Sequence, residues 1–246
     1  MNPPRNPPPD SHPDSHPDSH PGSAPDSHPD SLPETLPGSL PDPVADPPTP
    51  PRDQAFAQSW KARILATPPL ILPARQYVYP RPVPGEEDAL GRGALLLEVT
   101  PPRTEPPNPG SFLATCALGF QDPTLPSGIF ACPRPEDLLA LAGGYAYLID
   151  THAPERCLHL PLRPVTQVLS APADGLLLLS GFHHVLALDA GGVRWQSARL
   201  SWEGVTMTAV RDGALHGLGW NLHTDREAAF RIDLLTGAHQ GGGFTE

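Results

Sequence analysis

The amino-acid sequence predicts an all-β fold of stacked antiparallel sheets in a propeller-like arrangement, preceded by a disordered tail. Two observations lead to this prediction. About three units of roughly 40 residues repeat in the C-terminal half, and each contains two apolar segments joined by a glycine-bearing turn. The prolines are also unevenly distributed, because 18 of the 37 lie in residues 1–51 and only four lie in the last 111 residues.

Residues 1–51 have the composition of a disordered, acidic tail. They contain eight acidic side chains, one arginine and no aromatic residue, so they bury too little apolar surface to offset the entropy lost on ordering. A tetrapeptide, Asp-Ser-His-Pro, recurs over residues 10–31. In a polyproline II helix a four-residue period rotates successive histidines by about 120° and separates them by about 12 Å. We therefore expect no metal site among these histidines.

Residues 52–246 are expected to form a single all-β domain with one short helix near 53–66. Asp53 could cap this helix, Phe56, Trp60 and Ile64 follow at a spacing of four, and two prolines at 68 and 69 would end it. Short apolar runs separated by proline-rich connections predict strands after the helix. These runs are QYVY (76–79), ALLLEV (94–99), SFLATCALGF (111–120) and GIFAC (128–132).

Three stretches can be aligned in the last third of the chain: residues 137–150, 174–189 and 212–233. Their opening aspartates, Asp137, Asp174 and Asp212, are spaced by 37 and 38 residues, and each stretch ends on a second aspartate. We interpret these closing aspartates as structural, since a short carboxylate after a strand accepts backbone N–H groups in an Asx-turn. They are Asp150, Asp189 and Asp233.

The size of the unit matches one blade of a β-propeller. Two further strand-like segments follow the first two stretches, RCLHLPL with VTQVLSA and VRWQSARL with GVTMTAV. A strand–turn–strand unit of about 40 residues is typical of a blade, but about four to eight blades are needed to close a ring. The strands between residues 70 and 132 would therefore supply a further blade-like sheet or cap the open edge.

The segments VLALDAGGVRWQS and FRIDLLTGAHQGG resemble the repeat of quinoprotein-type propellers, in which a strand ends in Ala-Leu-Asp and is followed by Thr-Gly and often by tryptophan. The resemblance covers residues 137–246. Only Trp195 keeps the tryptophan and only Thr236-Gly237 keeps the Thr-Gly pair, so the resemblance does not imply the cofactor of the enzymatic members. Residues 70–246, with AGGYAYLID and LSWEGVTMTAV, are also similar to a bacterial family of uncharacterised proteins, which implies no activity.

Composition argues against several classes of partner. The formal net charge is −11, lysine occurs once, and the arginines are scattered, so we expect no nucleic-acid binding. No stretch resembles a secretory signal or approaches the roughly 18 apolar residues of a membrane span. The three cysteines, Cys116, Cys132 and Cys157, form no CxxC pair and are expected to be buried free thiols. We therefore expect a cytoplasmic protein without a cofactor or membrane partner.

The polar segment at residues 219–230 is the first candidate for a binding site. It lengthens the turn of the third stretch by six to eight residues, and loops carry function more often than the scaffold does. Trp220 would be a stacking platform and Arg226 an anion-binding group; alternatively, Trp220 packs in the core and Arg226 forms a surface ion pair. A turn at 200–204 is the second candidate. The candidate binding residues are Trp220, His223, Asp225, Arg226, Glu227, Trp202 and Glu203.

Catalytic and metal motifs are missing from the sequence. Adjacent strand residues point to opposite faces, so His183 and His184 are not expected to share a metal, and the cysteine spacing fits no zinc motif. The leading hypothesis is a non-enzymatic binding or scaffold module that presents its turns to another protein. The alternative is a hydrolase acting on a small or sugar-like substrate through Glu203, Asp225 and Glu227, provided that two of them share a cleft.

Overall fold

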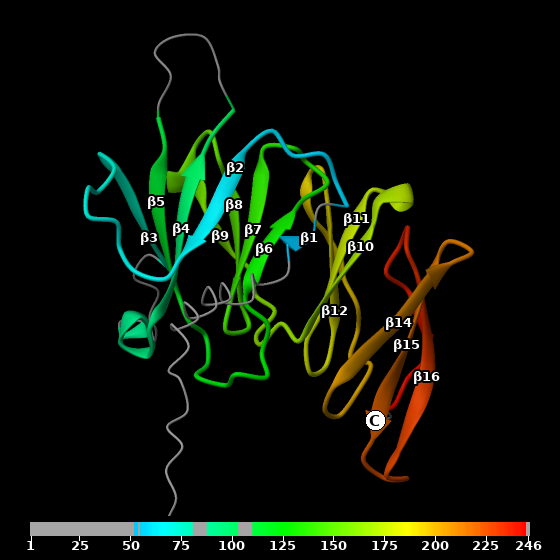
Figure 1. Ribbon diagram of the computed structural model, residues 1–246. Helices are drawn as coiled ribbons and strands as arrows, with labels where there is room; N and C mark the ends of the chain where they lie inside the picture. The colour runs from blue at the N-terminus through cyan, green and yellow to red at the C-terminus, as the bar shows by residue number, and fades with distance from the viewer. Residues whose placement is uncertain (1–51, 54, 81–87, 103–109, 245–246) are drawn as a thin grey trace, which may run out of the picture. The chain divides into compact units, whose positions relative to one another are not determined.

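The computed structural model describes residues 52–53, 55–80, 88–102 and 110–244. These residues lie in the unit that spans Asp46–Glu246, and they form four β-sheets with short 3-10 turns (Figure 1). The all-β prediction is therefore confirmed. The tail of residues 1–51 lies outside the described residues.

Two sheets form the N-terminal part of the fold. The first sheet has the strand order β2-β4-β5-β3, and the second has the order β1-β6-β7-β8-β9. All neighbours are antiparallel except β3 with β5 and β1 with β6, which are parallel. The bounds are β1 Arg52–Asp53, β2 Lys61–Leu65, β3 Arg75–Tyr79, β4 Ala94–Thr100, β5 Phe112–Ala117, β6 Gly128–Ala131, β7 Asp137–Ala142, β8 Tyr145–Asp150 and β9 Leu158–His159.

The third and fourth sheets follow in chain order and are fully antiparallel, with the orders β10-β11-β12-β13 and β14-β15-β16-β17. Each predicted repeat supplies the central hairpin of one sheet, namely β7–β8, β11–β12 and β15–β16. The bounds are β10 Gln167–Ala171, β11 Leu176–Ser180, β12 Val185–Asp189, β13 Gly192–Gln196, β14 Val205–Arg211, β15 Ala214–Asn221, β16 Arg226–Asp233 and β17 His239–Gly241; the 3-10 turns are η1 Ala89–Arg92, η2 Pro154–Arg156 and η3 Pro172–Asp174.

The helix predicted near residues 53–66 is wrong. Residues 61–65 form β2, which pairs with β4, and residues 52–53 form β1. The spacing of four that indicated a helix is also a multiple of the two-residue period of a strand. Trp60, Ala62 and Ile64 consequently lie on one face of the strand and pack in the same hydrophobic cluster. Strands β3, β4 and β5 join β2 in the first sheet, which is the further sheet that was one of the two expectations for residues 70–132.

Three hydrophobic clusters join the sheets in series. The first cluster lies between the first and second sheets, the second between the second and third, and the third between the third and fourth. Successive residues of a strand point to opposite faces, so a strand with a cluster on each side is apolar throughout. In β7, Leu138 and Ala140 pack in the first cluster while Leu139 and Leu141 pack in the second.

The two outermost faces are more polar than the faces between sheets. On the first sheet Lys61 and Arg63 are exposed, and Arg63 pairs with Glu98 on the neighbouring strand. On the fourth sheet Thr206 and Arg231 are exposed between residues that pack in the third cluster. Polar outer faces cap a repeated stack. Within the described residues, none of the three clusters joins the fourth sheet to the first.

Side chains also cross from one sheet to the next and bond to backbone groups. The Nε1 of Trp60 donates to the Asp137 carbonyl at 2.9 Å, and the Nε1 of Trp195 donates to the Leu234 carbonyl at 2.9 Å. Gln167 bonds both backbone groups of Met207, at 2.9 Å each, where β14 carries a bulge. These bonds fix the neighbouring sheets relative to each other.

The three closing aspartates have the structural role that the sequence predicts. Asp150 accepts the N–H groups of His152 and Ala153, and Asp189 accepts that of Gly191 at 2.7 Å. Asp233 accepts the N–H groups of residues 235 and 236. Each carboxylate therefore fixes the turn that follows its strand.

Candidate binding surfaces

The turn at residues 200–204 is held against β15 by hydrogen bonds. Ser201 Oγ accepts the Trp220 N–H at 2.8 Å, and the Trp202 N–H donates to the Trp220 carbonyl at 3.0 Å. The ring of Trp202 meets the ring of His223 edge to face, with 5.7 Å between centroids. The fold thus brings the two candidate segments of the sequence, 200–204 and 219–230, together on one surface, which we call the aromatic surface.

Arg199 stabilises the aromatic surface through contacts with two of its rings and with the backbone of the turn. Its guanidinium carbon lies 4.8 Å from the ring centroid of Trp202 and 4.5 Å from that of Phe244. Its Nε donates to the Ser201 carbonyl at 3.1 Å. This cation therefore stacks on two rings while bonding the turn, an arrangement that rigidifies the surface.

Residues 242–244 complete the same surface. The Gly243 N–H donates to the Leu200 carbonyl at 2.7 Å, and the glycine lies directly against the backbone of Trp220. A side chain at position 243 would collide with that backbone, so glycine is required there. The sequence suggests a flexible tail in residues 237–244, whereas residues 239–241 form β17 and residues 242–244 bond to the preceding structure.

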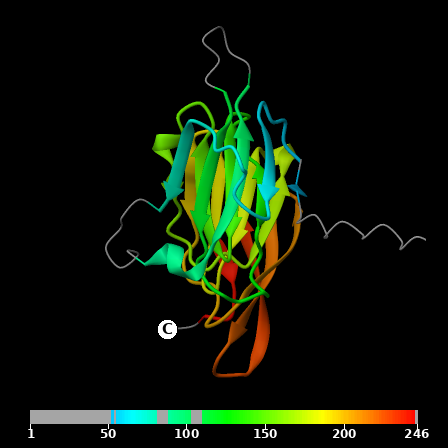
Figure 2. The same cartoon turned by 60° about the vertical axis from the view of Figure 1, so that its left-hand side comes forward.

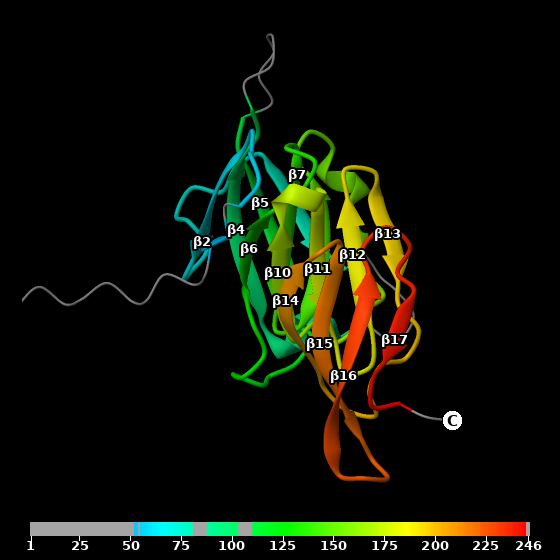
Figure 3. The same ribbon diagram turned by 90° about the vertical axis from the view of Figure 1, so that its right-hand side faces the viewer.

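The insertion predicted in the third repeat lengthens the strands and not the turn. β15 and β16 have eight residues each, compared with six in β7 and β8, and only residues 222–225 form the turn. Asn221 Oδ1 accepts the N–H groups of His223 and Thr224 at 3.0 Å, which closes the turn. The β15–β16 hairpin extends beyond the ends of the neighbouring strands (Figures 2 and 3).

The candidate residues divide into two groups by burial. Trp202 and Trp220 are half-buried, while five polar residues are exposed: Glu203, His223, Asp225, Arg226 and Glu227. Trp220 of β15 is opposite Glu227 of β16. Its side chain is on the face of the sheet away from the third cluster, because Leu215, an odd number of residues earlier on the strand, packs in that cluster. Trp220 is therefore outside the core, and Arg226 forms no ion pair within the described part of the chain.

The three carboxylates of the hydrolase hypothesis have no special environment. Glu203, Asp225 and Glu227 are all exposed, and none of them lines the cavity described next. General acid–base chemistry requires carboxyl groups that share a cleft with the substrate. Their placement therefore gives no support to that hypothesis.

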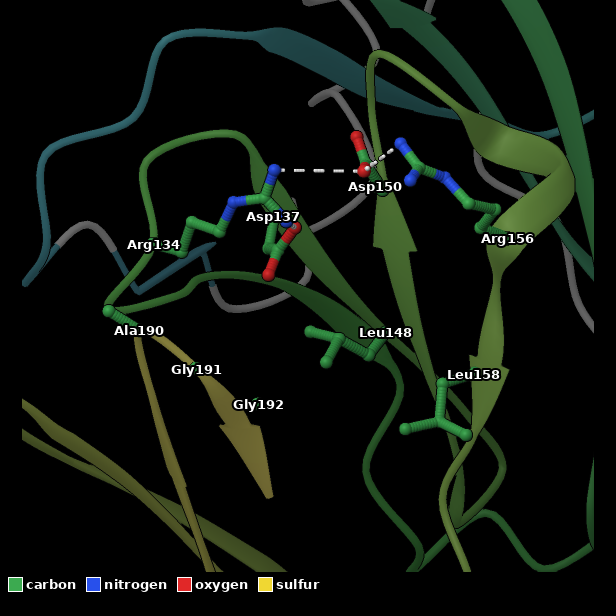
Figure 4. Close-up of a pocket in the computed structure, with 9 residues that line it drawn as sticks. All are labelled: Arg134, Asp137, Leu148, Asp150, Arg156, Leu158, Ala190, Gly191 and Gly192. Carbon is green, nitrogen blue, oxygen red and sulfur yellow. Dashed lines mark hydrogen bonds and ion pairs between the residues drawn. The ribbon is translucent and has the colours of Figure 1, made fainter. Parts of the chain in front are cut away.

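A cavity of about 280 Å³ lies between the second sheet and the β12–β13 turn of the third sheet (Figure 4). Asp137 and Asp150 lie opposite each other on the neighbouring strands β7 and β8. Arg134 and Arg156 lie beside them, and the β12–β13 turn forms the other side of the cavity. We call this site the aspartate cavity. Its lining residues are Arg134, Asp137, Leu148, Asp150, Arg156, Leu158, Ala190, Gly191 and Gly192.

Asp150 has a full set of partners in the aspartate cavity. Its Oδ1 accepts two backbone N–H groups of the Asx-turn, and its Oδ2 bonds Arg156 at 3.0 Å. Arg134 Nη2 lies 3.7 Å from the same Oδ2. Asp150 is therefore a structural carboxylate that also orients the two guanidinium groups.

Asp137 is less completely paired. Arg134 Nη1 donates to its Oδ1 at 3.3 Å, and the residue is only 7% exposed. Burial raises the pKa of Asp137 above its ordinary value, and the nearby Asp150 and Glu136 add to this, while Arg134 acts in the opposite direction. An incompletely paired, buried carboxylate in a cavity is typical of a functional site.

The sequence pattern does not predict this site, because Asp137 and Asp150 fit the repeat as its opening and closing residues. One signal was available: an arginine three residues before the opening aspartate and another six residues after the closing one occur only in the first repeat, as Arg134 and Arg156. The other repeats carry alanine at the first of these positions. A departure from the repeat pattern therefore marked the cavity.

The histidines and cysteines are arranged as structural residues. His183 and His184 bond the separate carbonyls of Ser201 and Ser197 through their Nδ1 atoms. Cys116 and Cys132 are buried free thiols and Cys157 is half-buried, and burial raises the pKa of Cys157 to about 12. In the part of the chain that the structure describes, no group of three potential ligands is arranged to hold a metal ion.

Comparisons with known proteins leave the family open. No family model and no curated protein matches the chain. Among the described residues, no helix has the length and hydrophobicity that crossing a bilayer requires. The functional conclusion therefore depends on the geometry of the two sites.

Proposed function

We propose that this protein is a non-enzymatic binding module whose aromatic surface contacts another protein. The observation that carries the proposal is the joining of Trp202, Trp220 and His223 by hydrogen bonds and ring contacts on one projecting end of the fourth sheet. Four sheets joined by continuous cores supply a rigid support for this surface.

The residue types of this surface favour a protein partner. Tryptophan and arginine are the residues that contribute most often to the binding energy of protein interfaces. The half-buried ring of Trp202 is already held by Arg199, His223 and Phe244, so little of its side-chain entropy is lost on binding. Half-buried Trp220 adds further apolar area. Leu222, which is 49% exposed at the hairpin turn, and Arg226 extend this area with an apolar and a cationic contact.

Affinity capture tests the proposal. The full chain is immobilised, exposed to an extract of its source cells, and compared with the Trp220→Ala and Arg226→Ala variants. We expect each variant to retain at most one tenth of the partner, corresponding to about 1.4 kcal/mol or more at a residue that dominates the interface.

A matched control removes an arginine from the opposite end of the stack. Arg63→Ala changes a side chain on the outer face of the first sheet and should leave capture unchanged. Equal capture of every partner by native protein and by both aromatic-surface variants would disprove the assignment of this surface.

We also propose that the four sheets are blades of an open propeller and that the protein acts in the cytoplasm. The serial cores and the central hairpins at a spacing of 37 to 38 residues support the first proposal. The three free thiols support the second, because reduced cysteines are typical of a cytosol.

A further inference from the structure

We propose that the aspartate cavity binds an alkylguanidinium or alkylammonium group, with Asp137 as its counter-ion. This site is separate from the aromatic surface and does not depend on the function proposed above. Three features support it: an available carboxylate oxygen, arginines that are already engaged by the carboxylates in and beside the cavity, and an apolar wall.

The available oxygen is Oδ2 of Asp137. The contact from Arg134 goes to Oδ1, and no described residue bonds Oδ2. The side chain is 9% exposed, and the close-up shows its carboxylate directed toward the space between β7 and the Ala190–Gly192 turn (Figure 4). A carboxylate oxygen that remains accessible can accept a charge-assisted hydrogen bond from a cationic ligand.

The charges around the cavity leave the carboxylates in excess. Arg134 lies within ion-pair distance of three carboxylates, those of Glu136, Asp137 and Asp150. Arg156 bonds Asp150. Two guanidinium groups and two carboxylates thus line the cavity, and Glu136, which lies outside its lining, adds a third carboxylate. Both guanidinium groups are already engaged, so a cationic ligand is favoured over an anionic one.

The remaining walls fit a short aliphatic arm. Leu148 and Leu158 line one side, and the opposite side is the turn of Ala190, Gly191 and Gly192, which has almost no side-chain bulk. The volume of about 280 Å³ is at the lower limit for small-molecule pockets, so it suits one alkyl chain with a charged end group. Either a free amine or guanidine, or an arginine or lysine side chain of a peptide, has this chemistry.

The pH dependence of binding follows from the state of Asp137. Burial raises its pKa above the ordinary value of 3.8, and the cation requires the ionised form. Affinity should therefore fall as the pH is lowered through this raised pKa. The other titratable or charged groups that face Asp137 are Arg134 and Glu136 before β7, Asp150 on β8, Arg156 in η2 and Cys132 after β6.

Calorimetric titration of the full chain tests the proposal. Butylguanidinium and butylammonium are the probes, butyrate is the control of opposite charge, and a capped Gly-Arg-Gly peptide distinguishes a peptide source from a free small molecule. We expect saturable one-to-one binding of the cations and none of butyrate. Tighter binding of the peptide than of butylguanidinium assigns the site to a peptide side chain, and the reverse assigns it to a free ligand.

Variants locate the binding. Asp137→Asn keeps the shape and the acceptor for Arg134, and it should weaken binding at least tenfold. Ala190→Leu narrows the cavity from the exposed turn without touching the charged groups and should also weaken binding. Asp174→Asn makes the same change at the opening aspartate of the second repeat and should have no effect. Absence of saturable cation binding, equal binding of butyrate, or native affinity in Asp137→Asn would overturn the proposal.

Discussion

Trp195 shows how a single residue connects two sheets. Its indole donates to the Leu234 carbonyl of the next sheet, and its ring lies directly against Gly237, where any side chain would collide with it. Trp195 and Gly237, which belong to the two segments that resemble the quinoprotein repeat, are thus in contact across the interface. Trp202 differs, because its Nε1 is buried without an acceptor among the described residues.

This difference predicts unequal effects of the same substitution. Trp195→Phe removes a buried inter-sheet hydrogen bond and leaves a carbonyl unpaired, so it should lower the free energy of unfolding by about 1–3 kcal/mol. Trp202→Phe loses no hydrogen bond and should cost less than half as much. Urea denaturation of both variants measures the two values; equal losses would show that the inter-sheet bond contributes nothing.

Residue-level prediction from the sequence succeeded for the closing aspartates and failed for Asp137. An Asx-turn depends on residues two or three positions apart, so a sequence pattern contains all the information needed. The environment of Asp137 depends on Arg134, on its cross-strand partner Asp150 and on a turn some 50 residues away in the chain. Only the folded arrangement of two sheets brings these groups together.

At the scale of elements, apolar runs identified nearly every long strand, and the helix near 53–66 was the main error. Residues 61–65 have spacing compatible with both periods, and a short segment does not decide between them. Pairing with β4 decides in favour of a strand. The polar residues of segment 219–230 likewise predict a loop. In the structure most of them belong to β15 and β16, where exposed residues occur because one side of the sheet faces solvent.

The β15–β16 hairpin contains a glycine whose size is essential. Gly217 faces Phe230 across the strand pair, and a methyl group there would overlap the Phe230 ring and the Thr206 carbonyl. Gly217→Ala should therefore cost about 1–3 kcal/mol in the free energy of unfolding. Gly91→Ala is the matched control, since no atom lies within 4 Å of the added group. Thermal denaturation compares them, and similar melting temperatures would contradict the close packing.

At the scale of the whole molecule, the fold is a series of sheets whose inner faces are apolar and whose end faces are polar. This arrangement follows from the strands themselves, since the two central sheets contain fully buried strands and the outer sheets contain alternating ones. The number of sheets could not be predicted from the three repeats, because the first sheet lacks the repeat pattern. The aromatic surface then lies at the end of the last sheet, where no further sheet covers it within the described residues.

Hydrogen–deuterium exchange of the chain with its captured partner directly tests whether the aromatic surface is the binding site. We predict slower exchange on binding in peptides that cover residues 199–204 and 218–228, with unchanged exchange over residues 61–65 and 94–100 of the first sheet. Protection confined to the first or second sheet, with unchanged exchange at the aromatic surface, would show that the partner binds elsewhere.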